Sequence, residues 1–70
     1  MNPALQLTIN GDQRSVADAA TVAELLDRLG LDGRGVVVEL NREIIRRGAL
    51  AATPIRDGDT VEIVHFVGGG

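Results

Sequence analysis

The sequence has 70 residues and a formal net charge of −3, from ten acidic residues and seven arginines, with no lysine and no cysteine. A chain of this size forms one small domain that buries roughly 60% of its surface, which leaves little room for an enclosed ligand pocket and argues against a self-contained enzyme. The acidic balance and the single aromatic residue argue against nucleic-acid binding, and the missing cysteines exclude disulfides, thiolate metal sites and cysteine nucleophiles.

The N-terminal residues predict a β-hairpin. Residues 4–10 alternate between apolar and polar side chains, which is typical of a strand with one buried face. Asn10-Gly11 follows, and this pair tolerates positive φ at both central positions of a tight turn. We therefore expect a second strand around Gln13–Val16, antiparallel to the first.

Residues 21–30 predict one amphipathic helix with both ends marked. Thr21 can cap the first turn, Glu24 completes a capping box, and Gly30 supplies the left-handed residue that ends the helix. Four apolar residues recur at helical spacing: Val22, Leu25, Leu26 and Leu29. This stripe must cover one face of a sheet to close a core.

The second half of the chain predicts three more strands. Residues 31–35 indicate a loop, residues 36–40 a strand and residues 43–45 a short strand. Residues 46–55 indicate a loop with room for one helical turn. Residues 60–66 alternate between apolar and polar side chains again, which predicts the last strand.

Together these elements predict an α+β fold, with a mixed sheet of four to five strands, one main helix packed on one face and the other face open to water. We expect residues 1–66 to form this domain and residues 67–70 to form a flexible tail. No run approaches the roughly 20 apolar residues of a membrane span, and the first residues lack the pattern of a signal peptide. We therefore expect a cytoplasmic protein with no membrane partner.

The last three residues, Gly68, Gly69 and Gly70, suggest a function because such a glycine run at a given end is rare by chance. A carboxylate is a poor electrophile because its charge is delocalised, and it accepts sulfur or an amine only after activation as a mixed anhydride with phosphate. Glycines can thread a narrow channel, and residues 67–70 could reach about 13–14 Å from the domain. We predict that a partner enzyme activates the Gly70 carboxylate with ATP.

Three apolar side chains, Val37, Val64 and Phe66, fall by alternation on the sheet face opposite the helix. Scattered apolar residues are common on protein surfaces, but a contiguous exposed patch usually marks a partner site. The position of Phe66 directly before the glycines favours a docking surface.

The remaining candidate sites have simpler explanations. His65 has no second histidine and no cysteine to join it, so we expect it to be a strand residue beside the tail and not a metal ligand. Asp57 and Asp59 are better explained by a tight turn than by a calcium loop, which needs several more oxygen ligands at fixed offsets. We expect no bound metal.

The element order and two segments, "LNREII" and "DGDTVEIVHFVGGG", resemble the β-grasp sulfur carriers, relatives of ubiquitin, and most closely the ThiS family of thiamine biosynthesis. The resemblance covers essentially the whole chain. The sister group, the molybdopterin synthase small subunit, typically has Pro-Pro-Val before its paired glycines, where this chain has "HFV". The chain departs from the family's pattern at Ile45-Arg46-Arg47, which lacks a proline, and at Leu50, which stands near an aromatic position.

This resemblance implies a β-grasp fold and a carrier without a catalytic residue or a bound cofactor. An adenylyltransferase related to ubiquitin-activating enzymes would adenylate Gly70 with Mg·ATP. A persulfide from a cysteine desulfurase would then leave a Gly70 thiocarboxylate, whose sulfur thiazole synthase would use for the thiazole of thiamine. Gly68 and Gly69 would give access, and Phe66, Val64 and Val37 would dock.

Other interpretations stay open at this point. The same carrier chemistry could serve molybdopterin, a cysteine precursor or tRNA thiolation. A ubiquitin-like protein modifier and a non-covalent interaction module are alternatives of a different class. Arg46 and Arg47 could add charge contacts to a partner, although a solvated pair is the simpler explanation.

Overall fold

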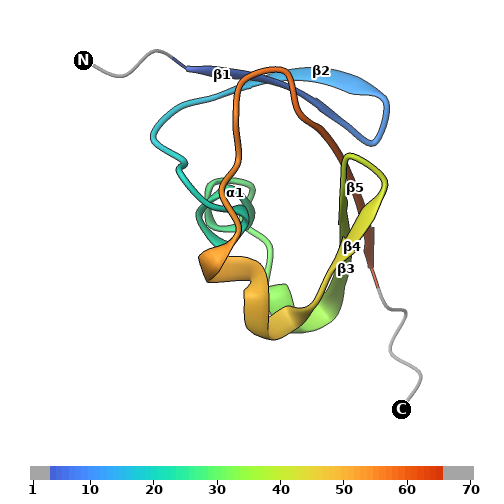
Figure 1. Cartoon of the computed structure of the whole chain (residues 1–70). Helices are drawn as coiled ribbons and strands as arrows, with labels where there is room; N and C mark the ends of the chain where they lie inside the picture. The colour runs from blue at the N-terminus through green and yellow to red at the C-terminus, as the bar shows by residue number, and fades with distance from the viewer. Residues whose placement is uncertain (1–3, 66–70) are drawn as a thin grey trace.

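The computed structural model describes residues 4–65, which contain five strands, one α-helix and two short 3-10 helices (Figure 1). The strands are β1 (Leu5–Ile9), β2 (Asp12–Val16), β3 (Val36–Leu40), β4 (Glu43–Ile45) and β5 (Thr60–His65). The helices are α1 (Val22–Arg28), η1 (Gly33–Gly35) and η2 (Arg47–Ala52). Each predicted strand and the predicted helix are present, within one residue or two of the expected bounds.

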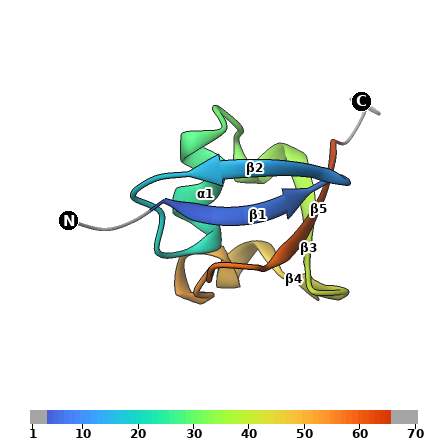
Figure 2. The same cartoon turned by 90° about the horizontal axis from the view of Figure 1, so that it is seen from above.

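The strands form one mixed sheet in the order β2-β1-β5-β3-β4. β1 and β5 are parallel neighbours, and the other three pairs are antiparallel. A parallel pair needs a crossover connection, and α1 lies within it. Figures 1 and 2 show α1 on one side of the curved sheet. The predicted α+β fold is therefore confirmed, with five strands.

The ends of α1 follow from the capping residues. The hydroxyl of Thr21 accepts a hydrogen bond from the Glu24 amide at 3.2 Å, and the Glu24 carboxylate accepts one from the amide of Ala20 at 2.6 Å. The box thus closes on the residue before Thr21. At the other end Gly30 has φ of +73°, and its amide donates to the Asp27 carbonyl at 3.1 Å. Both predicted helix signals are confirmed.

Asn10 and Gly11 form the predicted turn between β1 and β2, with φ of +50° and +85°. The Asn10 side chain also holds β5, because its amide oxygen accepts from the Ile63 amide at 2.7 Å and its nitrogen donates to the Ile63 carbonyl at 3.1 Å. The parallel backbone register ends at Ile9 and Val61. The Asn10 side chain therefore continues the pairing of β1 and β5 beyond the last residue of β1.

A second tight turn joins β3 to β4 at Asn41 and Arg42, which both have positive φ, +51° and +73°. Asn41 also fixes the start of β5, since its side-chain oxygen accepts from the Thr60 amide at 2.9 Å. Two positive φ values match the twist of a two-residue hairpin turn. This turn sets the register of β4 against β3, on which the candidate site depends.

The core between α1 and the sheet is entirely aliphatic. Its buried side chains are Leu7, Ile9, Val16, Val22, Leu25, Leu26, Val36, Val38, Leu50, Ile55, Val61 and Ile63. Each such side chain contributes about 1.5–3 kcal/mol on burial. One layer of helix covers one face of one sheet, so the other sheet face meets solvent, as the sequence predicts.

Two segments expected to be mainly loops contain 3-10 helices. η1 lies within the predicted loop of residues 31–35, where the Asp32 carboxylate accepts from the Arg34 amide at 2.9 Å. η2 spans six residues, more than the single turn expected, and its Leu50 is buried in the core. Gly33 permits their contact, since a Cβ there would lie 2.9 Å from the Leu50 side chain.

Candidate functional site

The candidate site is the outer face of β3, β4 and β5, on the side of the sheet away from α1. Val37 and Val64 are direct cross-strand partners there. Their sequence neighbours Val36, Val38 and Ile63 are buried, so alternation along each strand directs Val37 and Val64 outward. Val64 is 60% exposed and Val37 is half-buried. The structure places both where alternation predicts, while their role in docking stays a prediction.

Ile44 belongs to the same face, although the sequence analysis did not single it out. It is 65% exposed, and it pairs with Glu39 of β3, which alternates with the inward-facing Val38. The Asn41-Arg42 turn decides this register and therefore which of Ile44 and Ile45 points outward. The two-residue turn and the alternation of residues 43–45 were the signals that could have identified Ile44. We refer to Val37, Ile44 and Val64 as the apolar patch.

Two glutamates border the apolar patch. Glu39 and Glu62 are direct partners on β3 and β5, so two carboxylates of like charge face each other across the strands. Within residues 4–65 the one ion pair joins Asp32 to Arg34, so neither glutamate is neutralised there. A partner that places a cationic group beside these carboxylates would relieve their repulsion.

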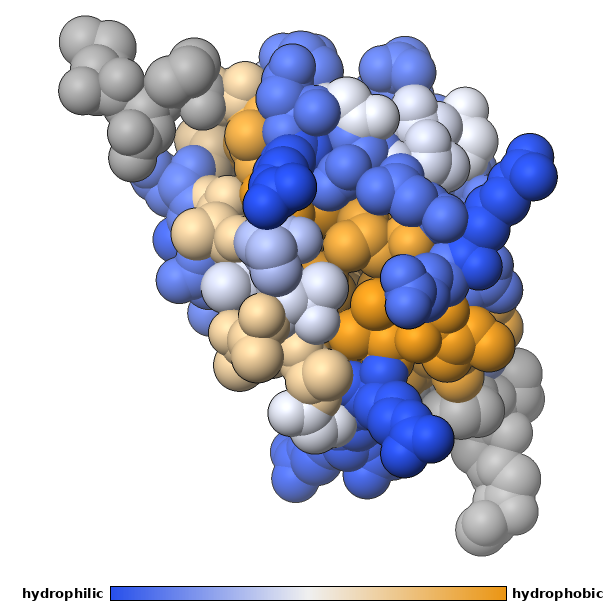
Figure 3. All heavy atoms as spheres, in the orientation of Figure 1, coloured by the Kyte–Doolittle hydropathy of each residue, from blue (hydrophilic) through white to orange (hydrophobic). Residues whose placement is uncertain are grey.

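Figure 3 shows how apolar surface is distributed on one side of the molecule. Hydrophobic surface is gathered in the middle and lower right of this view, with hydrophilic residues around it. On this side of the molecule, apolar residues are thus gathered in one area and not evenly scattered.

His65, the last residue of β5, pairs with Val36 and is exposed. Among residues 4–65, no group of three His, Cys, Asp or Glu side chains lies close enough together to hold a metal ion. The one ion pair of these residues joins Asp32 to Arg34. The hydrogen bond from the Arg34 side chain is the main cause that lowers the pKa of Asp32 from 3.8 to about 2. Asp32 is the N-cap residue of η1 and Arg34 lies within η1, in the segment that precedes β3.

The predicted reactive tail lies outside the described residues. Phe66, Gly68, Gly69 and Gly70 therefore stay predictions, as does the division between residues 1–66 and 67–70. The described part of β5 remains paired with β3 up to its final residue, His65. The apolar patch therefore lies at the end of β5 from which the chain continues to these residues.

The two central arginines differ in their contacts. The guanidinium of Arg47 donates to the Arg34 carbonyl at 3.3 Å, and Arg46 forms the residue before η2. Both side chains are exposed.

In the part of the chain that is described, no helix is both long and apolar enough to cross a membrane.

Comparison with known proteins identifies relatives along the whole chain. Residues 7–70 match the model of the ThiS family. The sequence is 42% identical over 65 residues to the sulfur carrier protein ThiS of Bacillus subtilis (strain 168), a match that covers 91% of this chain and 98% of the relative.

Longer proteins also match. The sequence is 46% identical over 66 residues to a thiazole synthase of Paramagnetospirillum magneticum, a match that covers 94% of this chain and 20% of the relative. The chain thus spans about a fifth of the length of the thiazole synthases that it matches.

A solved structure agrees with the fold. The crystal structure of the thiamine biosynthesis protein (ThiS) from Geobacter metallireducens superposes with a TM-score of 0.80 at 43% sequence identity. The superposition covers 94% of this chain and 100% of that one. The likeness therefore extends over the whole compact fold, including the five-stranded sheet.

Proposed function

We propose that this chain, which belongs to the ThiS family of thiamine-biosynthesis sulfur carriers, carries sulfur as a thiocarboxylate on Gly70. The observation that carries the proposal is the family match over residues 7–70, which includes the three glycines. The proposal requires Gly70 to end the mature chain with a free carboxylate. The chain itself acts as a carrier, and its partners supply the catalytic groups.

The chemistry begins with activation. The Gly70 carboxylate attacks the α-phosphate of Mg·ATP on an adenylyltransferase and forms an acyl-adenylate, with release of pyrophosphate. The terminal sulfur of a persulfide then attacks the acyl carbon and displaces AMP. A thiol cleaves the resulting sulfur–sulfur bond and supplies the two electrons that leave a thiocarboxylate on Gly70. Binding and positioning are the contribution of this chain.

The apolar patch is the surface that we propose to hold the carrier on the activating enzyme. Val37, Ile44 and Val64 gather on the outer face, and the chain continues to Phe66 and the glycines directly from β5. Docking through this face would leave α1 outside the contact and set the start of the tail against the enzyme. Glu39 and Glu62 favour a partner surface with basic residues.

Thiazole synthase is the proposed sulfur acceptor. The support is that thiazole synthases of two organisms contain a segment similar to this chain, at 46% and 33% identity. A carrier segment and a synthase within one protein indicate that the two activities act on the same pathway. We propose that the chain delivers its sulfur to such an enzyme for the thiazole ring.

Intact-mass measurement tests the proposal. The chain is incubated with an adenylyltransferase of the same organism, Mg·ATP, a cysteine desulfurase and cysteine. We expect a mass gain equal to the exchange of one oxygen for sulfur, located by fragmentation on Gly70. The gain should be absent without ATP or without cysteine. An unchanged mass, with each enzyme active on its own, would contradict the proposal.

A further inference from the structure

β2 is an edge strand with unused backbone groups. The Thr8 amide of β1 donates to the Asp59 carbonyl, just before β5, at 3.0 Å. The Asn10 amide, just after β1, donates to the Val61 carbonyl of β5 at 2.9 Å. Because backbone groups alternate between the two sides of a strand, the intervening residues of β1 pair with β2, for example with Arg14. The amides and carbonyls of Gln13 and Ser15 therefore point away from β1, on the side where residues 4–65 provide no further strand.

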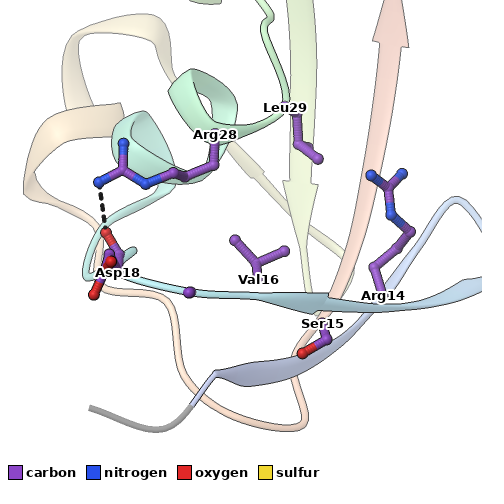
Figure 4. A pocket seen from close by; sticks show the side chains of 7 residues that line it. Arg14, Ser15, Val16, Asp18, Arg28 and Leu29 are labelled. Atoms are coloured by element: carbon purple, nitrogen blue, oxygen red, sulfur yellow. Dashed lines mark hydrogen bonds between the residues drawn. The ribbon is translucent and has the colours of Figure 1, made fainter. Parts of the chain in front are cut away.

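A groove of about 300 Å³ lies beside this edge, between β2 and the C-terminal end of α1 (Figure 4). Val16 and Leu29 lie in its middle, and Arg14 and Arg28 lie on either side of them. The Arg28 guanidinium donates to the backbone carbonyl of Asp18 at 3.0 Å, which fixes this side chain at the rim. The groove thus has an apolar centre between two cations.

Neither arginine of the groove is neutralised within the described chain. In residues 4–65 the one ion pair is Asp32 with Arg34, so no carboxylate of that range lies within 4.0 Å of the cationic nitrogens of Arg14 or Arg28. The protein as a whole is acidic, with a net charge of −3. Asp18 also lines the groove, but its contact with Arg28 is through the backbone carbonyl, so both guanidinium groups remain able to pair with an anionic ligand.

We propose that this groove binds an extended acidic segment of a partner protein, which adds to β2 as a further strand. The free amides and carbonyls of Gln13 and Ser15 would pair with its backbone. One aliphatic side chain would pack on Val16, and carboxylates two positions before and after it would reach Arg14 and Arg28. Side chains two positions apart share one face of a strand and are about 6.6–6.8 Å apart.

An extended peptide fits the groove better than a small anion does. A free phosphate could bind the two guanidinium groups, but it would leave the strand edge unpaired and the apolar centre uncovered. A peptide with the pattern acidic, any, aliphatic, any, acidic uses all three features. A peptide is therefore the proposed ligand, and free phosphate serves as a comparison in the test.

The groove lies at the opposite end of the strands from His65, the last described residue before the proposed reactive tail. Val16 pairs with Leu5 at the start of β1, whereas β5 passes Ile9 at the end of β1 and continues to His65. A segment in the groove would therefore leave the apolar patch uncovered. A partner could hold the carrier by this groove while a second enzyme acts on the tail.

The test is an NMR titration of the ¹⁵N-labelled full chain with an end-blocked Asp-Thr-Val-Thr-Asp peptide. We expect saturable shift changes at the amides of Gln13 to Ala17 and at Arg28. Arg14→Gln and Arg28→Gln should each weaken binding by about two- to fivefold. Arg56→Gln removes an exposed arginine elsewhere and should leave the affinity unchanged.

Two further samples separate the strand from the charges. Ser15→Pro removes an edge amide that faces solvent, which an edge strand tolerates, and it should weaken binding while the melting temperature stays close to the parent value. An Asn-Thr-Val-Thr-Asn peptide should bind less tightly than the acidic one. Shift changes confined to β3, β4 and β5, equal affinity of the arginine variants, or phosphate reproducing the full set of shifts would each overturn the proposal.

Discussion

The two halves of the outer sheet face are built differently. On β1 and β2, polar side chains pair with one another. The side-chain amide of Gln6 donates to the Ser15 hydroxyl at 3.2 Å, and the side-chain amide of Gln13 donates to the Thr8 hydroxyl at 2.7 Å. On β3, β4 and β5 the corresponding positions hold the apolar patch and two like charges. The side chains of the first half satisfy one another by hydrogen bonds, whereas within residues 4–65 the second half leaves apolar surface exposed and two like charges unpaired.

This difference cannot be explained by the stability of a fold that has one core. An exposed aliphatic residue adds little to stability, because its surface remains in water in both the folded and the unfolded chain. The sheet could have carried polar pairs across all five strands. The proposed docking partner would account for apolar residues concentrated at the end of β5.

The largest expected effect comes from the end of the chain that follows the apolar half. Removal of Gly69 and Gly70 should abolish sulfur loading, because the activated carboxylate would no longer reach the nucleotide. The free energy of unfolding should change by less than about 0.5 kcal/mol. Loading is measured by intact mass and unfolding by urea titration.

A length-preserving control separates access from chemistry. Gly69→Ala keeps the carboxylate and the length, and it should slow loading without abolishing it, since only the passage of the tail becomes narrower. A large loss of stability on truncation would show that these residues support the fold and would contradict the assigned role.

The next effect compares the two halves directly. Val64→Asp should weaken binding to the adenylyltransferase by at least about tenfold, because it places a charge in the apolar patch. Thr8→Asp places the same charge on the polar half and should leave binding within about twofold. Calorimetric titration of both variants measures this difference. Equal weakening would show that the halves do not differ in function.

The sequence predicts the local features of this fold well because their causes are local. Thr21 and Gly30 mark the ends of α1 through hydrogen bonds within one turn, and Asn10-Gly11 specifies its turn through permitted φ values. Alternation alone places Val37 and Val64 on the outer face. These features depend on a few neighbouring residues, all of which are visible in the sequence.

Features that depend on distant contacts could not be predicted in the same way. The Asn10 side chain bridges to Ile63 on β5, and Leu50 of the six-residue η2 packs into the core beside Gly33. Both need the relative positions of elements far apart in the sequence. The exposure of Ile44, by contrast, follows from the two-residue turn before β4 and from alternation along residues 43–45.

A smaller effect concerns stability and tests the comparison from the other side. Gln13→Ala removes a cross-strand hydrogen bond of the polar half and should lower the free energy of unfolding by about 0.5 kcal/mol. Ile44→Thr in the apolar half should change it by less, since Ile44 is 65% exposed. Urea unfolding at fixed pH measures both. A greater loss from Ile44→Thr would show that the apolar patch stabilises the fold.

The smallest expected effect is a pH dependence of stability that arises from Asp32, the N-cap residue of η1, just before β3. The Arg34 side chain lowers the pKa of Asp32 from 3.8 to about 2, so the ionised carboxylate is favoured in the folded chain. Its stabilising contribution is therefore complete above about pH 4 and is lost as the pH falls through about 2. The melting temperatures of the parent and of Asp32→Asn should differ at pH 6 and converge toward pH 2. A difference in melting temperature that persists unchanged at pH 2 would mean that the Asp32 cap acts independently of its charge. The segment that leads into β3 would then be as insensitive to acid as the hydroxyl–amide hydrogen bonds of the polar half.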